Sequence, residues 1–241
     1  MLIPDGYLDA LVTASEGKAA MQSADLRALM TSLARNIGSA ATQDTLAKDV
    51  FQVEAATATQ RQAVAEGVRY LEQHYVVSPM PGWDAPIKSP RRLRLKPRRV
   101  FADPSLPASL LGMSPKRLME NMQVFGQLFE EMCLRDLSVY VQSMSQVATS
   151  PVRYYRDSDG LEVDAIIELK DGRWAGIEIK LGANKAEAAE KSLLRLAKKV
   201  AANPAARNPE PSFLAVLTGR TDFKYQTESG VYVFPLTCFA P

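Results

Sequence analysis

The chain has 241 residues, of which 46% are hydrophobic, and a formal net charge of only +2. It is long enough for one large domain or two small ones, each with its own core. The longest apolar stretches, such as "FLAVL" at 213–217, are too short to span a bilayer, and the N-terminus lacks the basic and apolar regions of a secretory signal. We therefore expect a cytoplasmic protein with no membrane partner.

Three helices are predicted in quick succession in the N-terminal part. Apolar residues recur at helical spacing in "SADLRALMTSLARNIG", which ends at Gly38, and "TQDTLAKDVF" follows with Thr42 as N-cap. A third helix, "TATQRQAVAEGVRYLEQHYVV", is capped by Thr57 or Thr59. Its expected apolar face consists of Val64, Val68, Leu71 and Tyr75. The only histidine, His74, has no second histidine to form a metal or relay site, so we expect a structural role.

A basic segment follows these helices. "YVVSPM" and "RLRLKPRRVFAD" have the pattern of two strands joined by a Pro- and Gly-rich loop, and this order predicts a winged helix-turn-helix with a basic wing. Seven cations and no acid in residues 88–99 suit contact with nucleic-acid phosphates. The predicted nucleic-acid-binding residues are Lys88, Arg91, Arg92, Arg94, Lys96, Arg98 and Arg99. A solvated charged hairpin and a surface for an acidic protein partner stay open as alternatives, and Glu66 and Glu72 on the third helix argue against strong base readout.

The domain expected over residues 1–102 is therefore helical with a winged helix-turn-helix, and the Pro- and Ser-rich residues 103–117 are the expected linker. Residues 118–241 form the expected second domain. It begins with a long helix from about Pro115 to Tyr140, whose apolar stripe includes Met122 and is bordered by Glu130. Cys133 on this helix and Cys238 near the C-terminus have no neighbouring Cys or His, so we expect no zinc site and no disulfide partner, and predict both as small core residues.

Three strands are predicted next, at about 152–156, 161–169 and 173–181. A helix in "NKAEAAEKSLLRLAKKVAAN", a buried strand in "SFLAVLTG" and a final strand pair in "FKYQT" and "VYVFPL" complete the domain. Because a helix connects the third strand to the fourth, these two strands are parallel. The predicted fold class is α/β, with an αβββαβ order and a mixed sheet.

The second and third strands form a hairpin with an unusual polar face. A strict alternation over residues 161–169 places Asp164 and Glu168 on one face and only apolar side chains on the other. A two-residue turn at Asp171-Gly172 would set Asp164 against an apolar neighbour. A three-residue loop at 170–172, with Gly172 in the left-handed conformation, instead pairs Asp164 with Glu178. We therefore predict these two carboxylates directly across from each other.

Two carboxylates this close repel each other unless a cation or a proton lies between them. Mg²⁺ or Mn²⁺ suits such a site, with water and substrate phosphate as further ligands. Lys180 lies on the same face, where its ammonium could orient the attacking water or stabilise the charge that grows on a phosphate. The alternative is an amphipathic hairpin with a solvated charged face and a cross-strand pair between Lys180 and Glu162.

Asp164, thirteen intervening residues and then Glu178-Ile179-Lys180, within an αβββαβ order, resemble the PD-(D/E)XK restriction-endonuclease-like superfamily. The resemblance implies that Asp164 and Glu178 bind the metal, that Lys180 assists phosphodiester hydrolysis, and that Glu130 in "GQLFEE" supplies a further acidic ligand. Val163 stands where the superfamily's motif has proline, a position that varies widely among its members.

Further segments extend the resemblance over about residues 25–237, among them "LARNIGSAATQDTLAKDV", "YLEQHYVVSPMPGW", "YYRDSDGLEVDAIIE" and "WAGIEIKLG". In this order they resemble the C-terminal half of a bacterial and archaeal family that pairs an AAA+ ATPase module with a winged helix and a nuclease-like domain classed as of unknown function. This chain lacks the GxxxxGK[ST] phosphate loop, and "ASEGKAA" at 14–20 is the nearest approach, so we expect no ATP binding. A truncated gene, a fragment, and a form whose AAA+ ATPase is a separate subunit all stay open.

Together these features predict a metal-dependent nuclease-like protein that acts on nucleic acid, with DNA as the expected substrate. The alternative is an inactive DNA- or protein-binding module of an AAA+ ATPase system. The intact Asp, Glu and Lys set favours the nuclease, and the missing ATPase module favours the binding module.

Overall fold

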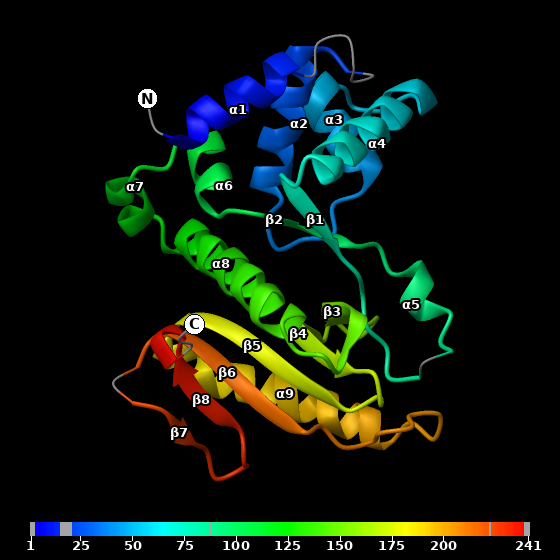
Figure 1. The fold of residues 1–241 in the computed structure, drawn as a ribbon, viewed down its shortest axis with the longest axis vertical. Coiled ribbons are helices and arrows are strands. Elements are labelled where there is room, and N and C mark those ends of the chain that lie inside the picture. The colour runs from blue at the N-terminus through cyan, green and yellow to red at the C-terminus, as the bar shows by residue number, and fades with distance from the viewer. Residues whose placement is uncertain (1–2, 15–20, 87, 222, 239–241) are drawn as a thin grey trace. The chain divides into compact units, whose positions relative to one another are not determined.

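The structure is a computed structural model that describes residues 3–14, 21–86, 88–221 and 223–238 (Figure 1). It is mixed α/β, with a helical N-terminal part and a mixed β-sheet. The chain divides into two compact units, the first made of Met1–Pro79 and Arg98–Glu131 and the second of Met80–Pro97 and Met132–Pro241. Among the described residues, no helix is long and apolar enough to cross a membrane. Residues 15–20 of "ASEGKAA" lie outside the described ranges.

The first unit begins with four helices, α1 (Ile3–Ala14), α2 (Ser23–Arg35), α3 (Gln43–Phe51) and α4 (Ala58–Gln73). Two of the expected helix starts are confirmed. The Thr42 hydroxyl accepts a hydrogen bond from the Thr45 N–H at 3.0 Å, and Thr57 forms a capping box with Gln60 at the start of α4. These caps satisfy backbone N–H groups that have no partner inside the helix.

Two short strands, β1 (Val77–Met80) and β2 (Arg98–Phe101), pair into a two-stranded sheet after these helices. Tyr75 was expected on the apolar face of the preceding helix, but α4 ends at Gln73. Tyr75 has a φ of 56° and is 80% exposed, because it belongs to the left-handed turn that leads into β1. His74 has structural contacts: its Nδ1 lies 2.9 Å from the Tyr70 carbonyl oxygen and its ring 4.1 Å from the Tyr70 ring.

Residues 103–117, the expected linker, are instead a packed part of the first unit. They contain α6 (Ser105–Leu110) and the start of α7 (Pro115–Glu120), and Leu106 is buried in the same apolar cluster as the helices α1 to α4. The single long helix expected from about Pro115 is broken at Asn121, which separates α7 from α8 (Met122–Gln142). Met122 is 55% exposed at the start of α8, so its expected place in the apolar stripe is wrong.

Residues 80–97, which connect β1 to β2, belong to the second unit. Here they are called the connecting segment. The Trp83 N–H donates to the Tyr154 carbonyl at 2.7 Å, and the Tyr154 N–H donates to the Pro81 carbonyl at 3.2 Å. Trp83 is 1% exposed, with its ring 5.1 Å from that of Trp174. The segment expected to form a loop and a basic wing is therefore held by backbone hydrogen bonds and a buried indole, and it includes the short helix α5 (Arg91–Arg94).

A six-stranded mixed sheet forms the centre of the second unit, with the order β3-β4-β5-β6-β8-β7. Its strands are β3 (Val147–Arg156), β4 (Glu162–Leu169), β5 (Trp174–Gly182), β6 (Phe213–Arg220), β7 (Tyr225–Gln226) and β8 (Tyr232–Pro235). The antiparallel β3-β4-β5 meander and the parallel pairing of β5 with β6 confirm the predicted topology. The β6 residues 214–218 are buried, as expected for a strand covered on both faces.

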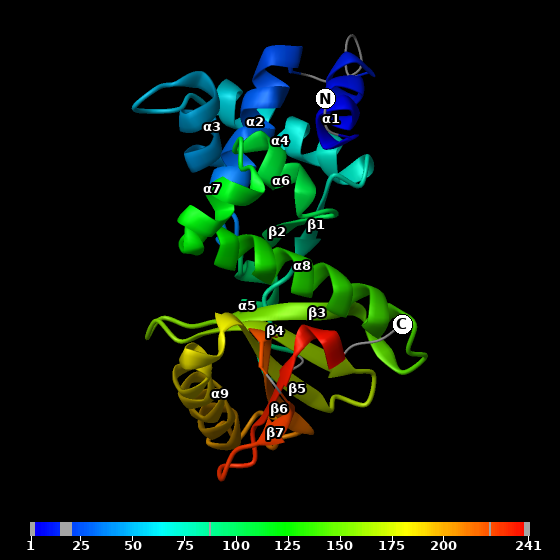
Figure 2. The same cartoon turned by 90° about the vertical axis from the view of Figure 1, so that its left-hand side faces the viewer.

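Helix α9 (Ala186–Ala201), which follows a short turn of 3₁₀ helix at Ala183–Lys185, covers one face of this sheet (Figure 2). Its predicted apolar face is confirmed, since Ala189, Leu193, Leu196 and Val200 are all buried against the sheet. The chain continues through β8 into a 3₁₀ turn at Leu236–Cys238. Cys133 is buried as predicted, whereas Cys238 is exposed in this turn, so its expected core position is wrong.

Candidate functional site

The hairpin of β4 and β5 has the predicted register. Its ladder pairs Ala165 with Ile177 and Glu168 with Trp174, which is the register that aligns Asp164 with Glu178. The turn is the expected three-residue loop, closed by a Leu169 N–H to Arg173 carbonyl bond of 2.8 Å, and Gly172 has a φ of 87°. The ladder ends one residue short of Asp164 and Glu178, so their side chains lie where the backbone pairing stops.

Strand β4 contains a β-bulge at Asp164 and Ala165, where its pairing with β3 shifts by one residue. Arg153 pairs with Ile166, but two residues further on Tyr155 pairs with Val163, so Asp164 and Ala165 together oppose Tyr154. The strict alternation expected over residues 161–169 is therefore wrong on the N-terminal side of the bulge. Leu161 and Val163 lie in the same apolar cluster as Ile166 and Trp174, because the extra residue reverses the facing of the strand.

Asp164, Glu178 and Lys180 form a compact cluster. The Lys180 Nζ lies 2.9 Å from Asp164 Oδ2 and also contacts Glu178 Oε2. Asp164 Oδ2 accepts a second hydrogen bond, from the Ile179 N–H at 2.8 Å. Asp164 and Glu178 are 7% and 3% exposed, so the alternative of a solvated charged face is wrong for this pair.

Burial and mutual repulsion set the charges of this cluster. The pKa of Glu178 is raised to about 8, chiefly by burial and next by the neighbouring Asp164, while Lys180 acts in the opposite direction. Burial would lower the pKa of Lys180, but the two carboxylates outweigh it and hold that pKa above its ordinary value. The site therefore holds one charged ammonium beside two carboxyl groups whose joint ionisation is costly.

The donor set of this cluster fits a hard divalent cation. Two adjacent carboxylates with a raised pKa at Glu178 are relieved by a positive charge between them, and Mg²⁺ is commonly bound by one or two carboxylates with water and phosphate as further ligands. Asp164 and Glu178 would hold the ion. In the described ranges, no three His, Cys, Asp or Glu side chains gather as a metal-binding group.

Glu130, the further acidic ligand implied by the resemblance, lies on α8 in the first unit. It forms an ion pair with Arg98 at 3.3 Å. Its role as a metal ligand stays a prediction.

The seven cations predicted to bind nucleic acid divide into two groups. Arg92 donates from both terminal nitrogens to Glu168 at 2.7 Å each and lies 5.8 Å from the Trp83 ring centroid. Arg98 is buried and forms an ion pair with the partly exposed Glu130, and Arg99 forms an ion pair with Glu72 at 3.4 Å. The remaining four are exposed and lie on the connecting segment: Lys88, Arg91, Arg94 and Lys96. Of the seven predicted cations, only these four are exposed to solvent, and their contact with nucleic acid stays a prediction.

The sequence does not predict the partnership of Arg92 with Glu168 and Trp83. Two features of the sequence bear on it. Glu168 lies on the predicted polar face of β4, and Trp83 is a large apolar side chain within a Pro- and Gly-rich segment, where burial is favoured. These two signals indicate a packed segment, but neither identifies the partner.

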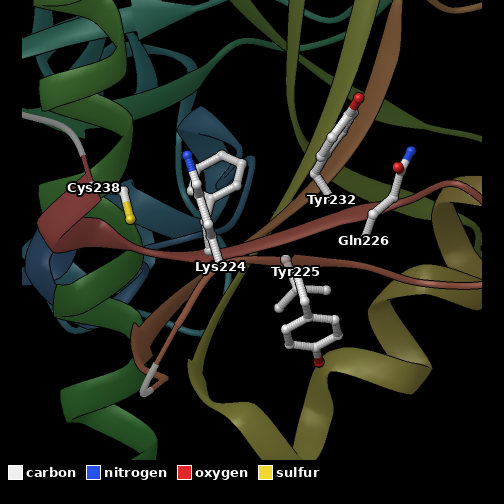
Figure 3. Close-up of a pocket in the computed structure, with 7 residues that line it drawn as sticks. Lys224, Tyr225, Gln226, Tyr232 and Cys238 are labelled. Carbon is white, nitrogen blue, oxygen red and sulfur yellow. The ribbon is translucent and has the colours of Figure 1, made fainter.

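A separate cavity of about 480 Å³ lies at the other end of the sheet, around β7 and β8. Figure 3 shows Lys224, Gln226 and Tyr232 projecting from one side of this hairpin and Tyr225 from the other. Cys238 also lines the cavity. None of the predicted site residues lines it.

The comparisons with known proteins give two family matches. Residues 125–239 match the model of a domain of unknown function, DUF4143. Residues 13–117 match a second domain of unknown function, DUF8612. Comparison with curated proteins returned no match.

Among solved structures, the chain is similar to one described as a refined half-complex from a tetradecameric assembly of Thermococcus gammatolerans McrB AAA+ hexamers with bound McrC. The identity is 10%, the TM-score is 0.30, and the match covers 88% of this chain and 46% of that chain. This chain thus spans about half the length of the matched one. At this TM-score the similarity carries no argument about fold or function.

Proposed function

We propose that the chain is a metal-dependent nuclease-like protein that hydrolyses phosphodiester bonds in nucleic acid, with DNA as the expected substrate. The observation that carries the proposal is the cluster of Asp164, Glu178 and Lys180, two buried carboxylates and an ammonium at the end of a strand ladder. Burial and proximity make it costly to ionise both carboxyl groups together, and groups perturbed in this way cluster at functional sites.

Each residue has a distinct role in the proposed hydrolysis. Asp164, oriented by the Ile179 N–H, and Glu178 would hold Mg²⁺ or Mn²⁺. When bound, such an ion activates a water molecule and stabilises negative charge on the phosphate. The Lys180 ammonium would orient the attacking water or stabilise the charge on the phosphate as the new P–O bond forms and the bond to the leaving oxygen breaks.

Nucleic acid would be held by the exposed cations of the connecting segment, Lys88, Arg91, Arg94 and Lys96. The three helices α2 to α4 followed by the β1–β2 sheet support a winged helix-turn-helix as a second contact. The resemblance to AAA+-associated proteins adds a separate AAA+ ATPase subunit as a proposed partner.

A plasmid-cleavage assay tests this function. Wild type should convert supercoiled plasmid to nicked or linear forms in Mg²⁺ or Mn²⁺ but not in EDTA, and Asp164→Asn should lose at least about 100-fold in rate, within the range expected for a group that supports charge stabilisation. Asp171→Asn is the matched control, because Asp171 is an exposed acid in the turn of the same hairpin and bonds to Arg173. Cleavage that survives in Asp164→Asn would contradict the assignment.

A binding module without turnover is the second candidate. It is favoured by the engagement of Lys180 with both carboxylates and by the absence, within the described ranges, of a third acidic group beside them. DNA binding by a wild type that shows neither cleavage nor metal binding would establish it.

A further inference from the structure

The Lys180 ammonium occupies the position that a metal ion held by both carboxylates needs. It contacts Asp164 Oδ2 at 2.9 Å and Glu178 Oε2. A divalent ion bound to the same oxygens would lie about 2.1 Å from each. An ammonium and a divalent ion repel each other at such separations, so Lys180 and the metal compete for one pair of carboxylates.

Lys180 is also the member of the cluster that can leave most readily. Its side chain is 26% exposed, whereas those of Asp164 and Glu178 are 9% and 4% exposed. Asp164 is further fixed by the Ile179 N–H. A lysine has a flexible four-carbon stem, so its charged end can move while the strand stays in place.

A phosphodiester offers the displaced ammonium a new acceptor. Hydrogen bonds from ammonium to phosphate oxygens are strong because both groups are charged. If the phosphate draws Lys180 away, the carboxylates lose their internal counter-ion and bind a metal ion more tightly. By thermodynamic linkage, the metal then raises the affinity for the phosphodiester by the same factor.

We propose that Lys180 is an internal counter-ion that couples metal binding to nucleic-acid binding, so that metal ion and phosphodiester displace it together. This inference rests on the proposed metal centre. It explains how a site can keep its carboxylates compensated in the free protein and still bind metal once substrate arrives. The coupling belongs to the wild-type protein and is measurable without cleavage.

The test is a Mn²⁺ titration of the full chain, followed by electron paramagnetic resonance, with and without a DNA oligonucleotide whose phosphorothioate linkages keep the charge but resist hydrolysis. In wild type, the DNA should tighten Mn²⁺ binding by roughly 5- to 150-fold, the usual range for coupled sites. Lys180→Met should bind Mn²⁺ at least about 10-fold more tightly than wild type without DNA, and DNA should add little. Asp164→Asn with DNA measures the Mn²⁺ that the oligonucleotide binds by itself.

Lys180→Arg is the second variant. It keeps the positive charge and gives an independent readout if Lys180→Met does not fold. It should bind Mn²⁺ weakly without DNA and retain the tightening with DNA. The inference is overturned if DNA leaves the wild-type affinity unchanged, or if folded Lys180→Met binds Mn²⁺ no more tightly than wild type. The proposed metal centre itself fails, separately, if wild type and Asp164→Asn bind Mn²⁺ equally.

Discussion

The ion pair between Arg92 and Glu168 is expected to hold the connecting segment against β4 within the second unit. Arg92 makes two hydrogen bonds of 2.7 Å to the Glu168 carboxylate, and the two side chains are only 11% and 8% exposed. Arg92→Met removes the charge but keeps a long apolar side chain beside Trp83. Breaking a buried pair by removing one partner typically costs about 3–5 kcal/mol. We expect about 3 kcal/mol, because Arg153 stays 4.0 Å from Glu168 and compensates part of the charge.

Urea unfolding followed by tryptophan fluorescence measures this loss of stability in the second unit, which contains the ion pair. The only two tryptophans, Trp83 and Trp174, are both buried in the second unit. With a typical slope of about 1–3 kcal/mol per molar urea, the midpoint should fall by roughly 1–3 M.

Glu187→Gln is the control for this experiment, because it breaks an exposed pair with Lys191 and should shift nothing measurable. Arg92→Met combined with Glu168→Leu should regain much of the lost stability, since no buried charge is left without its partner. A midpoint shift in Arg92→Met no larger than in Glu187→Gln would show that the buried ion pair does not stabilise the second unit.

Three further predictions concern other parts of the chain. The pKa of Glu131 is raised from an ordinary 4.5 to about 8, chiefly by burial, although the hydrogen bond from the Phe101 N–H opposes the shift. The unfolding free energy of the first unit should therefore fall as pH rises from about 4.5 to about 8. Circular-dichroism melts should show a flatter pH dependence for Glu131→Gln, and an unchanged slope would disprove this prediction. Gly172→Ala should lower the stability of the second unit by about 1–2 kcal/mol, because only glycine adopts a φ of 87° without cost, and Gly172→Asn should lose less; equal losses would count against the turn geometry. Replacing Lys88, Arg91, Arg94 and Lys96 with glutamine should weaken DNA binding and reduce the slope of log affinity against log salt by up to about 0.9 per lost phosphate contact, whereas an unchanged affinity would remove these residues from the interface.

The order of elements and the hairpin register were predictable because they depend on local rules. Period-two and helical spacing indicated the strands and helices of the second unit, and Gly172 determined the loop length that aligns Asp164 with Glu178. Parity then predicted the two carboxylates and Lys180 on one side, and Lys180 contacts both carboxylates although the bulge breaks the alternation at Asp164. The candidate site was therefore accessible from a stretch of nineteen residues, 162–180, without any long-range information.

The bulge and the connecting segment were not predictable in the same way. A bulge at Asp164 and Ala165 adds one residue to one strand, and the apolar pattern of "LEVDAIIEL" fits both a regular and a bulged strand. Arg92 and Glu168 are 76 residues apart. Their pairing depends on how the connecting segment packs on the sheet, and no periodicity within residues 80–97 encodes that packing. For the same reason the seven cations had the sequence pattern of a basic wing, although Arg92, Arg98 and Arg99 form ion pairs in the structure.

The most direct test of the metal centre is an anomalous difference map from crystals of the full chain grown with Mn²⁺ and the phosphorothioate oligonucleotide. We expect one peak about 2.1 Å from a carboxylate oxygen of both Asp164 and Glu178, with the Lys180 ammonium no longer between them. A map with the lysine still in contact with both carboxylates and no anomalous peak beside them would contradict it.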